Sequence, residues 1–460
     1  MGSAVSDTIA AVATGGQPCA IGILRLSGPG ALAALDGVFT PLRGEPMSRR
    51  PDRQLVYGVL RDREGREIDR CLATVTRGPG SYTGEDTAEL QCHGSPMVLS
   101  LGLEALFARG VRQAGPGEFT RRAFLNGRLD LTQAEAVIDL IDAQTPEAAR
   151  QAAGQLAGAL SGRIGGIYDG LVDLMAHFHA VLDYPDEDIE PFRAEEMAAA
   201  LDRAAGELEA LAGTWRRGRQ LTQGVPCAIV GRPNAGKSSL LNALVGYERA
   251  IVTDIPGTTL DTVEERVRLG GVLLRLIDTA GLRESGDPIE RLGVERSRAA
   301  MEEAELILVV WDGSLPAREE DVELLARAVS LAPTVLVHAK GDLPPAPVPF
   351  LTLGPMPPEV TVSAKTGQGL EELEAAVAAL FPPERAAPAG ELLTNARQAG
   401  AAARAAQAVA RAREALRAGV TPDAVLTEVE QALSALGELT GRTVREDITD
   451  RIFSRFCVGK

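Results

Sequence analysis

The chain has 460 residues, enough for roughly two to four domains that each bury a core. Its net charge of −16 argues against a protein that grips nucleic acid over a broad basic face, so an RNA substrate would need a local basic patch or a partner protein. No apolar run is long enough to span a membrane, the N-terminus lacks a signal-peptide pattern, and the five cysteines show no C-x-x-C spacing. We therefore expect a cytoplasmic protein without membrane contact, and neither a zinc site nor a disulfide scaffold is implied.

Residues 1–125 mix short apolar runs with turn signals, which predicts an α+β domain. Its expected strands include residues 20–26 and 72–76, and residues 99–109 are expected to form a helix. His93 stands in a loop beside a glycine, where histidine is more often a structural hydrogen-bonding residue than a catalyst.

Residues 126–222 carry a helical pattern, in which Thr132 and Glu135 predict a capping box and Thr145-Pro146 predicts a helix start. The pattern stops near residue 223 and returns in residues 384–460, with helices expected at 395–417 and 423–436. We infer that an α/β module, residues 223–383, is inserted into one helical domain whose two halves pair in space.

The inserted module opens on Gly231-Arg232-Pro233-Asn234-Ala235-Gly236-Lys237-Ser238, which fits the phosphate-binding pattern G-x-x-x-x-G-K-[ST]. Residues 227–230 predict a strand before the loop, and residues 239–244 predict the start of a helix after it. In that setting backbone amides and the helix dipole converge on the phosphates. Lys237 is expected to reach the β- and γ-phosphates, and the Ser238 hydroxyl to bind Mg²⁺.

The other nucleotide elements follow in order. A strand at 273–277 ends in Asp278-Thr279-Ala280-Gly281, whose aspartate can hold Mg²⁺ through water and whose glycine amide can meet the γ-phosphate. Asp342 follows a buried strand and can accept from guanine N1–H and the 2-amino group, which selects GTP over ATP. The predicted GTP contacts are Asn234, Ala235, Gly236, Lys237, Ser238, Ser239, Thr253, Asp254, Ile255, Pro256, Gly257, Thr258, Thr259, Asp278, Thr279, Ala280, Gly281, Lys340, Asp342, Ser363, Ala364 and Lys365.

Three positions depart from the usual GTPase pattern. Leu282 stands where Ras-like proteins carry a water-orienting glutamine, so hydrolysis must be organised differently. Ala339 replaces the usual asparagine of Asn-Lys-x-Asp, which should weaken nucleotide binding by about 1–2 kcal/mol. Leu260 replaces the arginine that usually follows Gly-Thr-Thr.

Lysine is rare in this chain. All of its 47 basic residues are arginine except Lys237, Lys340, Lys365 and Lys460. A codon bias explains arginine on the surface, whereas lysine persists where a compact ammonium cannot be exchanged for a planar guanidinium. Lys460, outside the GTPase module, is therefore a candidate ligand-binding residue.

The residues resemble the MnmE (TrmE) family of tRNA-modification GTPases over nearly the whole chain. The similar segments are Gly22–Arg25, Tyr82–Asp86, Pro116–Thr120, Ala123–Asn126, the nucleotide motifs and the terminal Phe456-Cys457-Val458-Gly459-Lys460. The resemblance implies a homodimer that works with MnmG, a partner that uses FAD and NADH. Together they would add an aminomethyl or carboxymethylaminomethyl group at C5 of the wobble uridine (position 34) of certain tRNAs. The one-carbon unit would come from 5-formyl- or methylene-tetrahydrofolate.

The resemblance also assigns roles to residues. It implies a K⁺ site made by Asn234, Thr253, Ile255 and Thr258, where the ion replaces an arginine finger. Ser238 and Thr259 would bind Mg²⁺, and Glu290 would position the attacking water; as an alternative, Glu290 is a surface residue that starts a helix face. The folate contacts would be Arg25, Glu89, Arg128 and Lys460, with Cys457 required for the modification. The implied fold class is multidomain: an α+β N-terminal folate-binding and dimerisation domain, a helical domain and an inserted Ras-like α/β P-loop GTPase domain.

A second class of function remains open at this stage. A regulatory or assembly GTPase would bind ribosomal particles without chemistry of its own. That alternative gives no reason for Arg25, Glu89 or the terminal Cys457.

Overall fold

The structure is a computed structural model. It describes residues 7–183, 194–248, 265–277, 298–347, 356–382, 388–443, 449, 452–454 and 456–459. The chain divides into two compact units, each described here by itself. Unit 1 comprises Met1–Ile138, Gly154–Glu209 and Gly400–Lys460; unit 2 comprises Asp139–Ala153 and Ala210–Ala399.

The N-terminal part of unit 1 is a seven-stranded sheet of order β3-β4-β5-β6-β2-β1-β7, antiparallel except for the pair β1–β7. Its strands are β1 (Ile9–Val12), β2 (Cys19–Ser27), β3 (Phe39–Pro41), β4 (Val56–Arg61), β5 (Glu67–Thr76), β6 (Thr87–Gly94) and β7 (Arg112–Gln113). The helical elements of this part are α1 (Ala31–Val38), η1 (Met47–Arg49), α2 (Pro96–Phe107) and α3 (Glu118–Leu125).

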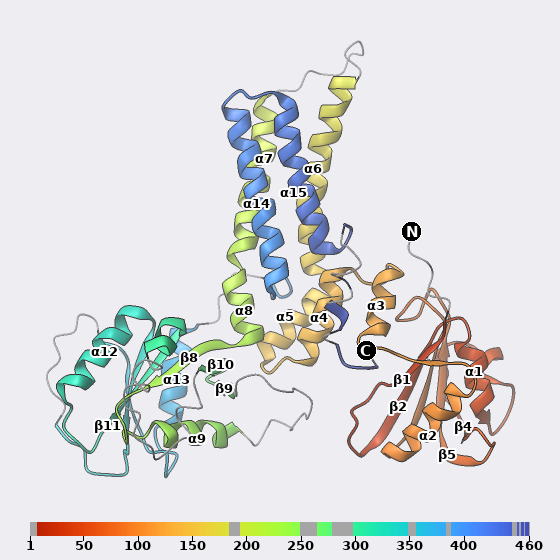
Figure 1. The fold of residues 1–460 in the computed structure, drawn as a ribbon, viewed down its shortest axis with the longest axis horizontal. Helices are drawn as coiled ribbons and strands as arrows, with labels where there is room; N and C mark the ends of the chain where they lie inside the picture. The colour runs from red at the N-terminus through yellow and green to blue at the C-terminus, as the bar shows by residue number, and fades with distance from the viewer. Residues whose placement is uncertain are drawn as a thin grey trace. The chain divides into compact units, whose positions relative to one another are not determined.

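Helices α1 and α2 pack against this sheet and close its main core (Figure 1). Strands β5 and β6 alternate buried and less buried residues, as expected when one face of a sheet is covered. The α+β N-terminal fold predicted from the sequence is confirmed.

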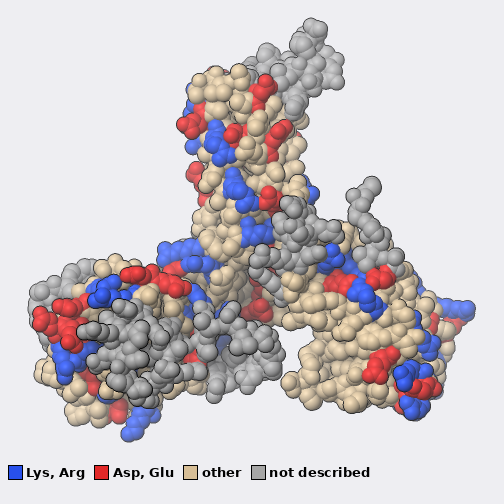
Figure 2. Space-filling view, in the orientation of Figure 1, with Lys and Arg blue, Asp and Glu red and all other residues tan. Residues whose placement is uncertain are grey.

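Four long helices form a bundle in the rest of unit 1: α6 (Ala159–Asp183), α7 (Ala194–Gly213), α14 (Ala396–Arg417) and α15 (Pro422–Thr440). Arg413 on α14 pairs with Asp202 on α7 at 3.2 Å, and Arg411 pairs with Glu428 on α15 at 2.8 Å. Basic and acidic side chains are interspersed on the bundle face seen in Figure 2. Helices from before and after the α/β module therefore pack together, as an insertion requires.

Shorter helices, α4 (Leu131–Ile141), α5 (Pro146–Leu156) and α8 (Trp215–Gln223), complete the helical part. The capping box expected from Thr132 and Glu135 is wrong. Asp130 accepts from the Gln133 amide at 2.9 Å, and the Gln133 side chain accepts from the Asp130 amide at 3.0 Å, so the box begins two residues earlier. Thr145 caps α5 as predicted, accepting from the Ala148 amide at 3.1 Å.

Unit 2 is built on a six-stranded sheet of order β13-β12-β11-β8-β10-β9, parallel except for the β9–β10 hairpin. Its elements are β8 (Val225–Val230), α9 (Lys237–Glu248), β9 (Glu265–Leu269), β10 (Val272–Ile277), β11 (Leu306–Asp312), α12 (Glu319–Leu331), β12 (Thr334–Ala339), β13 (Glu359–Val362) and α13 (Leu370–Leu380). Separate cores cover the two faces, so the central strands β8 and β11 are buried almost throughout. The predicted α/β P-loop fold is confirmed.

Strand β9 was not predicted from the sequence. It joins β10 through Gly270 and Gly271, which have φ of +59° and +76°. A Gly-Gly pair between apolar runs is a hairpin signal, because both central residues of a type I′ turn need positive φ. No helix among the described residues is long and apolar enough to cross a membrane.

Candidate functional site

The phosphate-binding loop joins the buried strand β8 to the start of helix α9. Gly231, Asn234 and Gly236 in this loop have φ of +155°, +63° and +107°. A Cβ on Gly231 would lie 2.3 Å from the Val310 carbonyl oxygen, so only glycine fits where the loop leaves the sheet. These turns suit a loop whose backbone amides surround an anion at the helix N-terminus.

Lys237 is held inside this loop. Its Nζ donates to the carbonyl oxygens of Gly231 and Arg232, both at 2.8 Å. Burial lowers the pKa of Lys237 from its usual value. The ammonium is thus already beside the loop amides, where it can exchange carbonyl partners for phosphate oxygens.

The predicted base-recognition loops lie next to each other because β12 and β13 are paired. Ala339 and Val362 are partners at the ends of these strands, and the Gly341 amide donates to the Val362 carbonyl at 3.1 Å. Ser363 Oγ donates to Asp342 Oδ1 at 2.9 Å. The structure thus brings Asp342 and Ser363 together and orients the carboxylate expected to read guanine.

Lys340 has φ of +61°, and its Nζ lies 2.6 Å from Asp312 Oδ2 at the end of β11. Burial raises the pKa of Asp312, but hydrogen bonds from Lys340 and Ser314 outweigh it and hold the pKa below its usual value. This ion pair ties the loop after β12 to the neighbouring strand.

The structure also shows the surroundings of Ala339, which replaces the usual asparagine of Asn-Lys-x-Asp. Its side chain is buried, and its Cβ lies 3.1 Å from where a Cβ on Gly236 would stand. Position 339 therefore faces the phosphate-binding loop, where an amide side chain could join the two loops and alanine cannot.

Several predicted residues lie outside the described residues, and their roles stay predictions. They are Thr253, Asp254, Ile255, Pro256, Gly257, Thr258, Thr259, Leu260, Asp278, Thr279, Ala280, Gly281, Leu282, Glu290 and Lys460.

A second candidate site lies in unit 1, where Arg25 on β2 is the cross-strand partner of Glu89 on β6. Arg25 Nε donates to Glu89 Oε1 at 2.8 Å, and each side chain is about a quarter exposed, at 23% and 28%. The guanidinium also lies 5.9 Å from the centre of the Phe119 ring, and its Nη1 donates to the Gly459 carbonyl at 3.4 Å. Two predicted folate contacts therefore meet beside the C-terminal segment.

The C-terminal segment 456–459 is seated on the N-terminal sheet by glycines. Val458 bridges to Pro116, and the Gly117 amide donates to the Cys457 carbonyl at 3.2 Å. Gly117 has φ of +64°, and a Cβ there would lie 2.7 Å from the Phe453 carbonyl oxygen. A Cβ on Gly459, which has φ of +98°, would lie 2.2 Å from the Val12 carbonyl oxygen. Neither position accommodates a side chain without displacing the segment.

Aromatic packing anchors the same segment. Phe453 and Phe456 are buried, with ring centres 5.3 Å apart, and they form a core cluster with Ala134 and the partly buried Phe124. Cys457 lies directly after this anchor and its side chain is exposed. The exposed thiol thus belongs to a segment whose Gly459 carbonyl contacts Arg25.

Arg128 joins neither Arg25 nor Glu89 in the described contacts. Its Cγ lies 3.3 Å from where a Cβ on Gly84 would stand, so its stem covers the loop that contains Tyr82. The Tyr82 hydroxyl shares a 2.9 Å hydrogen bond with Thr120. A folate contact by Arg128 therefore stays a prediction.

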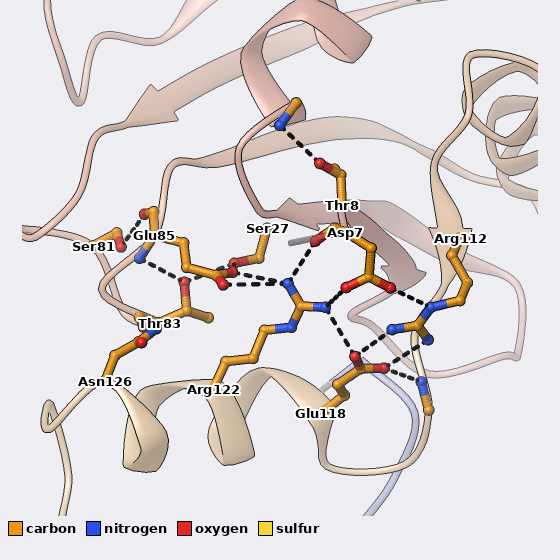
Figure 3. Close-up of polar contacts among 12 residues, drawn as sticks. Asp7, Thr8, Ser27, Ser81, Thr83, Glu85, Arg112, Glu118, Arg122 and Asn126 are labelled. Carbon is orange, nitrogen blue, oxygen red and sulfur yellow. Dashed lines mark hydrogen bonds and ion pairs between the residues drawn. The ribbon is translucent and has the colours of Figure 1, made fainter. Parts of the chain in front are cut away.

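Arg122 is a buried residue that the sequence analysis missed. Its side chain is 2% exposed and donates to Asp7 Oδ1 at 2.8 Å, Glu118 Oε1 at 3.0 Å and Glu85 Oε2 at 3.1 Å (Figure 3). Asn126 completes the network by donating to the Thr83 carbonyl at 2.7 Å. The segments Tyr82–Asp86 and Pro116–Thr120 thus meet at one guanidinium, and Asn126 joins Ala123–Asn126 to the first of them, which makes the three segments parts of a single scaffold.

Comparison with known proteins agrees with this architecture. Residues 8–128 match the family model for the GTP-binding protein TrmE N-terminus, and residues 131–457 match the MnmE helical domain. The chain is 48% identical over 457 residues to the tRNA modification GTPase MnmE of Symbiobacterium thermophilum, covering 99% of both chains. It is 46% identical over 464 residues to the protein of that name from Roseiflexus sp., covering 99% of both chains. The corresponding Chloroflexus aurantiacus protein is 43% identical over 459 residues, which cover 99% of this chain and all of the relative. The chain therefore belongs to the MnmE family of tRNA modification GTPases.

Proposed function

We propose that this GTP hydrolase acts as a homodimer with an MnmG-type FAD-binding protein that uses NADH. The pair adds an aminomethyl or carboxymethylaminomethyl group at C5 of uridine 34 in certain tRNAs. A tetrahydrofolate, in its 5-formyl or methylene form, supplies the one-carbon unit. Hydrolysis of GTP requires Mg²⁺ and K⁺ and accompanies dimerisation of the GTPase domains.

The single observation that carries the proposal is the seating of the C-terminal segment, which contains Cys457, against Arg25. Arg25 and Gly459 lie 434 positions apart in the chain, yet a hydrogen bond of 3.4 Å joins them. A GTPase that only regulates assembly needs no exposed thiol on a segment that contacts an arginine–glutamate pair. A folate offers the matching chemistry, because its glutamate carboxylates suit the Arg25 guanidinium and its ring amide and amine groups suit Glu89.

The nucleotide site supports the GTPase half of the proposal. Lys237 is held among the loop carbonyls, and the neighbouring Ser238 is exposed at the start of α9, a position from which its hydroxyl can bind Mg²⁺. Asn234 is exposed at a left-handed turn of the same loop, which leaves its side-chain oxygen accessible to a K⁺ ion. The remaining ligands expected for both ions lie outside the described residues.

Nucleoside mass spectrometry of tRNA from cells without this protein tests the proposal. We expect the C5-substituted wobble uridine to disappear and to return when the full-length chain is supplied. A chain that lacks residues 456–460 should hydrolyse GTP within a few-fold of the normal rate but restore no modification. Normal modification in cells without the protein, together with defective ribosomal particles, would refute the proposal and favour an assembly GTPase.

A further inference from the structure

Strands β5 and β6 bring two cysteines together that lie far apart in sequence. The antiparallel register pairs Leu72 with Gln91, which places Cys71 next to Cys92 on the covered face of the sheet. Asp69 precedes Cys71 by two residues and therefore points to the same face. The two thiol sulfurs and a carboxylate oxygen of Asp69 lie within 4.8 Å of one another.

The three side chains are shielded from solvent. Cys71 is 4% exposed, Cys92 is 2% exposed and the Asp69 side chain is 8% exposed. Glycines flank the cysteine pair in the same row of the sheet, since Gly58 pairs with Cys71 and Gly22 with Cys92. The sulfurs and the carboxylate are therefore close together and buried, near the start of β5 and the end of β6.

Asp69 is oriented by hydrogen bonds from its neighbours in the sheet. It accepts from the backbone amides of Arg70 and His93 and from His93 Nδ1, all at 2.8 Å. These bonds use three of about four acceptor positions of a carboxylate, which leaves capacity for a further ligand. Among the described ion pairs, His93 is the only basic side chain joined to Asp69. A buried carboxylate normally needs a paired charge or a metal.

We propose that Asp69, Cys71 and Cys92 bind one thiophilic divalent cation of the zinc class. Two sulfurs and one carboxylate oxygen suit Zn²⁺, whereas Mg²⁺ and Ca²⁺ take oxygen ligands. Three protein ligands leave the fourth position of a tetrahedral ion for water. His93 is a positioning residue, because a histidine bonded to a ligating carboxylate fixes its orientation.

A disulfide between Cys71 and Cys92 is the competing interpretation. It would use the two sulfurs and assign no role to the buried carboxylate or to His93. The arrangement of all four residues is what favours a cation.

The test is a cobalt titration of the reduced, chelator-treated full-length protein without nucleotide. We expect one equivalent of Co²⁺ per chain to produce a thiolate-to-cobalt charge-transfer band, which added Zn²⁺ removes. Cys71→Ala and Cys92→Ala should each weaken Co²⁺ binding by at least about 100-fold, and His93→Phe by about 10- to 100-fold. The conservative His93→Gln, which keeps a side-chain donor to Asp69, should recover part of that loss.

Cys19→Ser is the matched control. Cys19 is an exposed thiol on β2 of the same sheet, so its loss should leave the stoichiometry and affinity unchanged. Circular dichroism of the metal-free variants checks that they are folded, and the wild-type titration decides the question if they are not. Absence of the band at one equivalent of Co²⁺ would overturn the proposal. A Cys71–Cys92 disulfide in the purified protein, with no cation bound after reduction, would overturn it in favour of a redox pair.

Discussion

Replacing Gly459 by alanine should unseat the C-terminal segment and abolish tRNA modification without slowing GTP hydrolysis. The residue has φ of +98°, a conformation that costs a non-glycine residue about 1–2 kcal/mol. The added methyl would lie 2.2 Å from the Val12 carbonyl oxygen. The segment must therefore move by about 1 Å to restore an ordinary carbon–oxygen contact.

The segment, and not the sheet, is expected to give way. Val12 is paired with Leu24 inside the sheet, and the next amide, Ala13, donates to the Ile23 carbonyl at 2.8 Å. The contact of the Gly459 carbonyl with Arg25, at 3.4 Å, is the first to break, at a further cost of about 1 kcal/mol. The total of about 2–3 kcal/mol lowers the ratio of the seated to the unseated population by roughly 30- to 150-fold.

Gly110→Ala is the control for backbone strain alone. Gly110 also lies in the N-terminal domain and has φ of +82°, but nothing stands within 4 Å of the position of its Cβ. Three measurements compare the variants: the yield of modified wobble uridine, the rate of GTP hydrolysis, and the rate at which carboxypeptidase trims the C-terminus. If Gly459→Ala matches Gly110→Ala in yield and trimming, the steric argument for the seated segment is refuted.

Four further predictions concern the remaining sites. GTP hydrolysis should be much faster in K⁺ than in Na⁺ and Asn234→Ala should remove the difference, so equal wild-type rates in the two salts would exclude the K⁺ site. Glu290→Ala should lower turnover by at least about 100-fold with GTP affinity, measured by equilibrium binding, nearly unchanged; a parallel loss of affinity would mark a structural residue. Ala339→Asn should tighten GTP binding by about 1–2 kcal/mol in calorimetry, because position 339 faces Gly236, and unchanged binding would contradict the missing tether. Arg122→Met should destabilise the N-terminal domain by about 1–3 kcal/mol in denaturant unfolding, because Glu85 loses its paired cation and Asp7 and Glu118 keep only Arg112; a loss below about 0.5 kcal/mol would contradict that role.

The fold of the nucleotide-binding part was largely predictable from the sequence, because its determinants are local. The phosphate-binding loop needs a strand, a loop with glycines at fixed spacing and a helix start, and these three parts are contiguous in the chain. The structure confirms that order, with β8 before Gly231 and α9 starting at Lys237. Buried parallel strands also have a distinctive continuous apolar pattern, which made β12, the strand before Asp342, predictable from the sequence.

The helix starts show where local reasoning fails within a few residues. Both Asp130 and Thr132 are capping residues by type, and the sequence alone favoured Thr132. Asp130 occupies the cap because its carboxylate meets the Gln133 amide at 2.9 Å, while the Thr132 hydroxyl bonds to Asp130 and Ser161. The reciprocal bonds between Asp130 and Gln133 fix the helix start, and the Ser161 contact engages the Thr132 hydroxyl elsewhere.

Contacts between distant segments were decided by the tertiary structure. Arginine is usually a surface residue, yet Arg122 is buried because Asp7 and Glu85, from distant parts of the chain, join Glu118 of its own helix to offset its desolvation. Cys71 and Cys92 show no metal-binding spacing in the sequence, and the register of β5 and β6 alone sets them side by side. Sequence periodicity indicates which face of a helix or strand is buried. The strand register and the path of the chain determine which residues that face contacts.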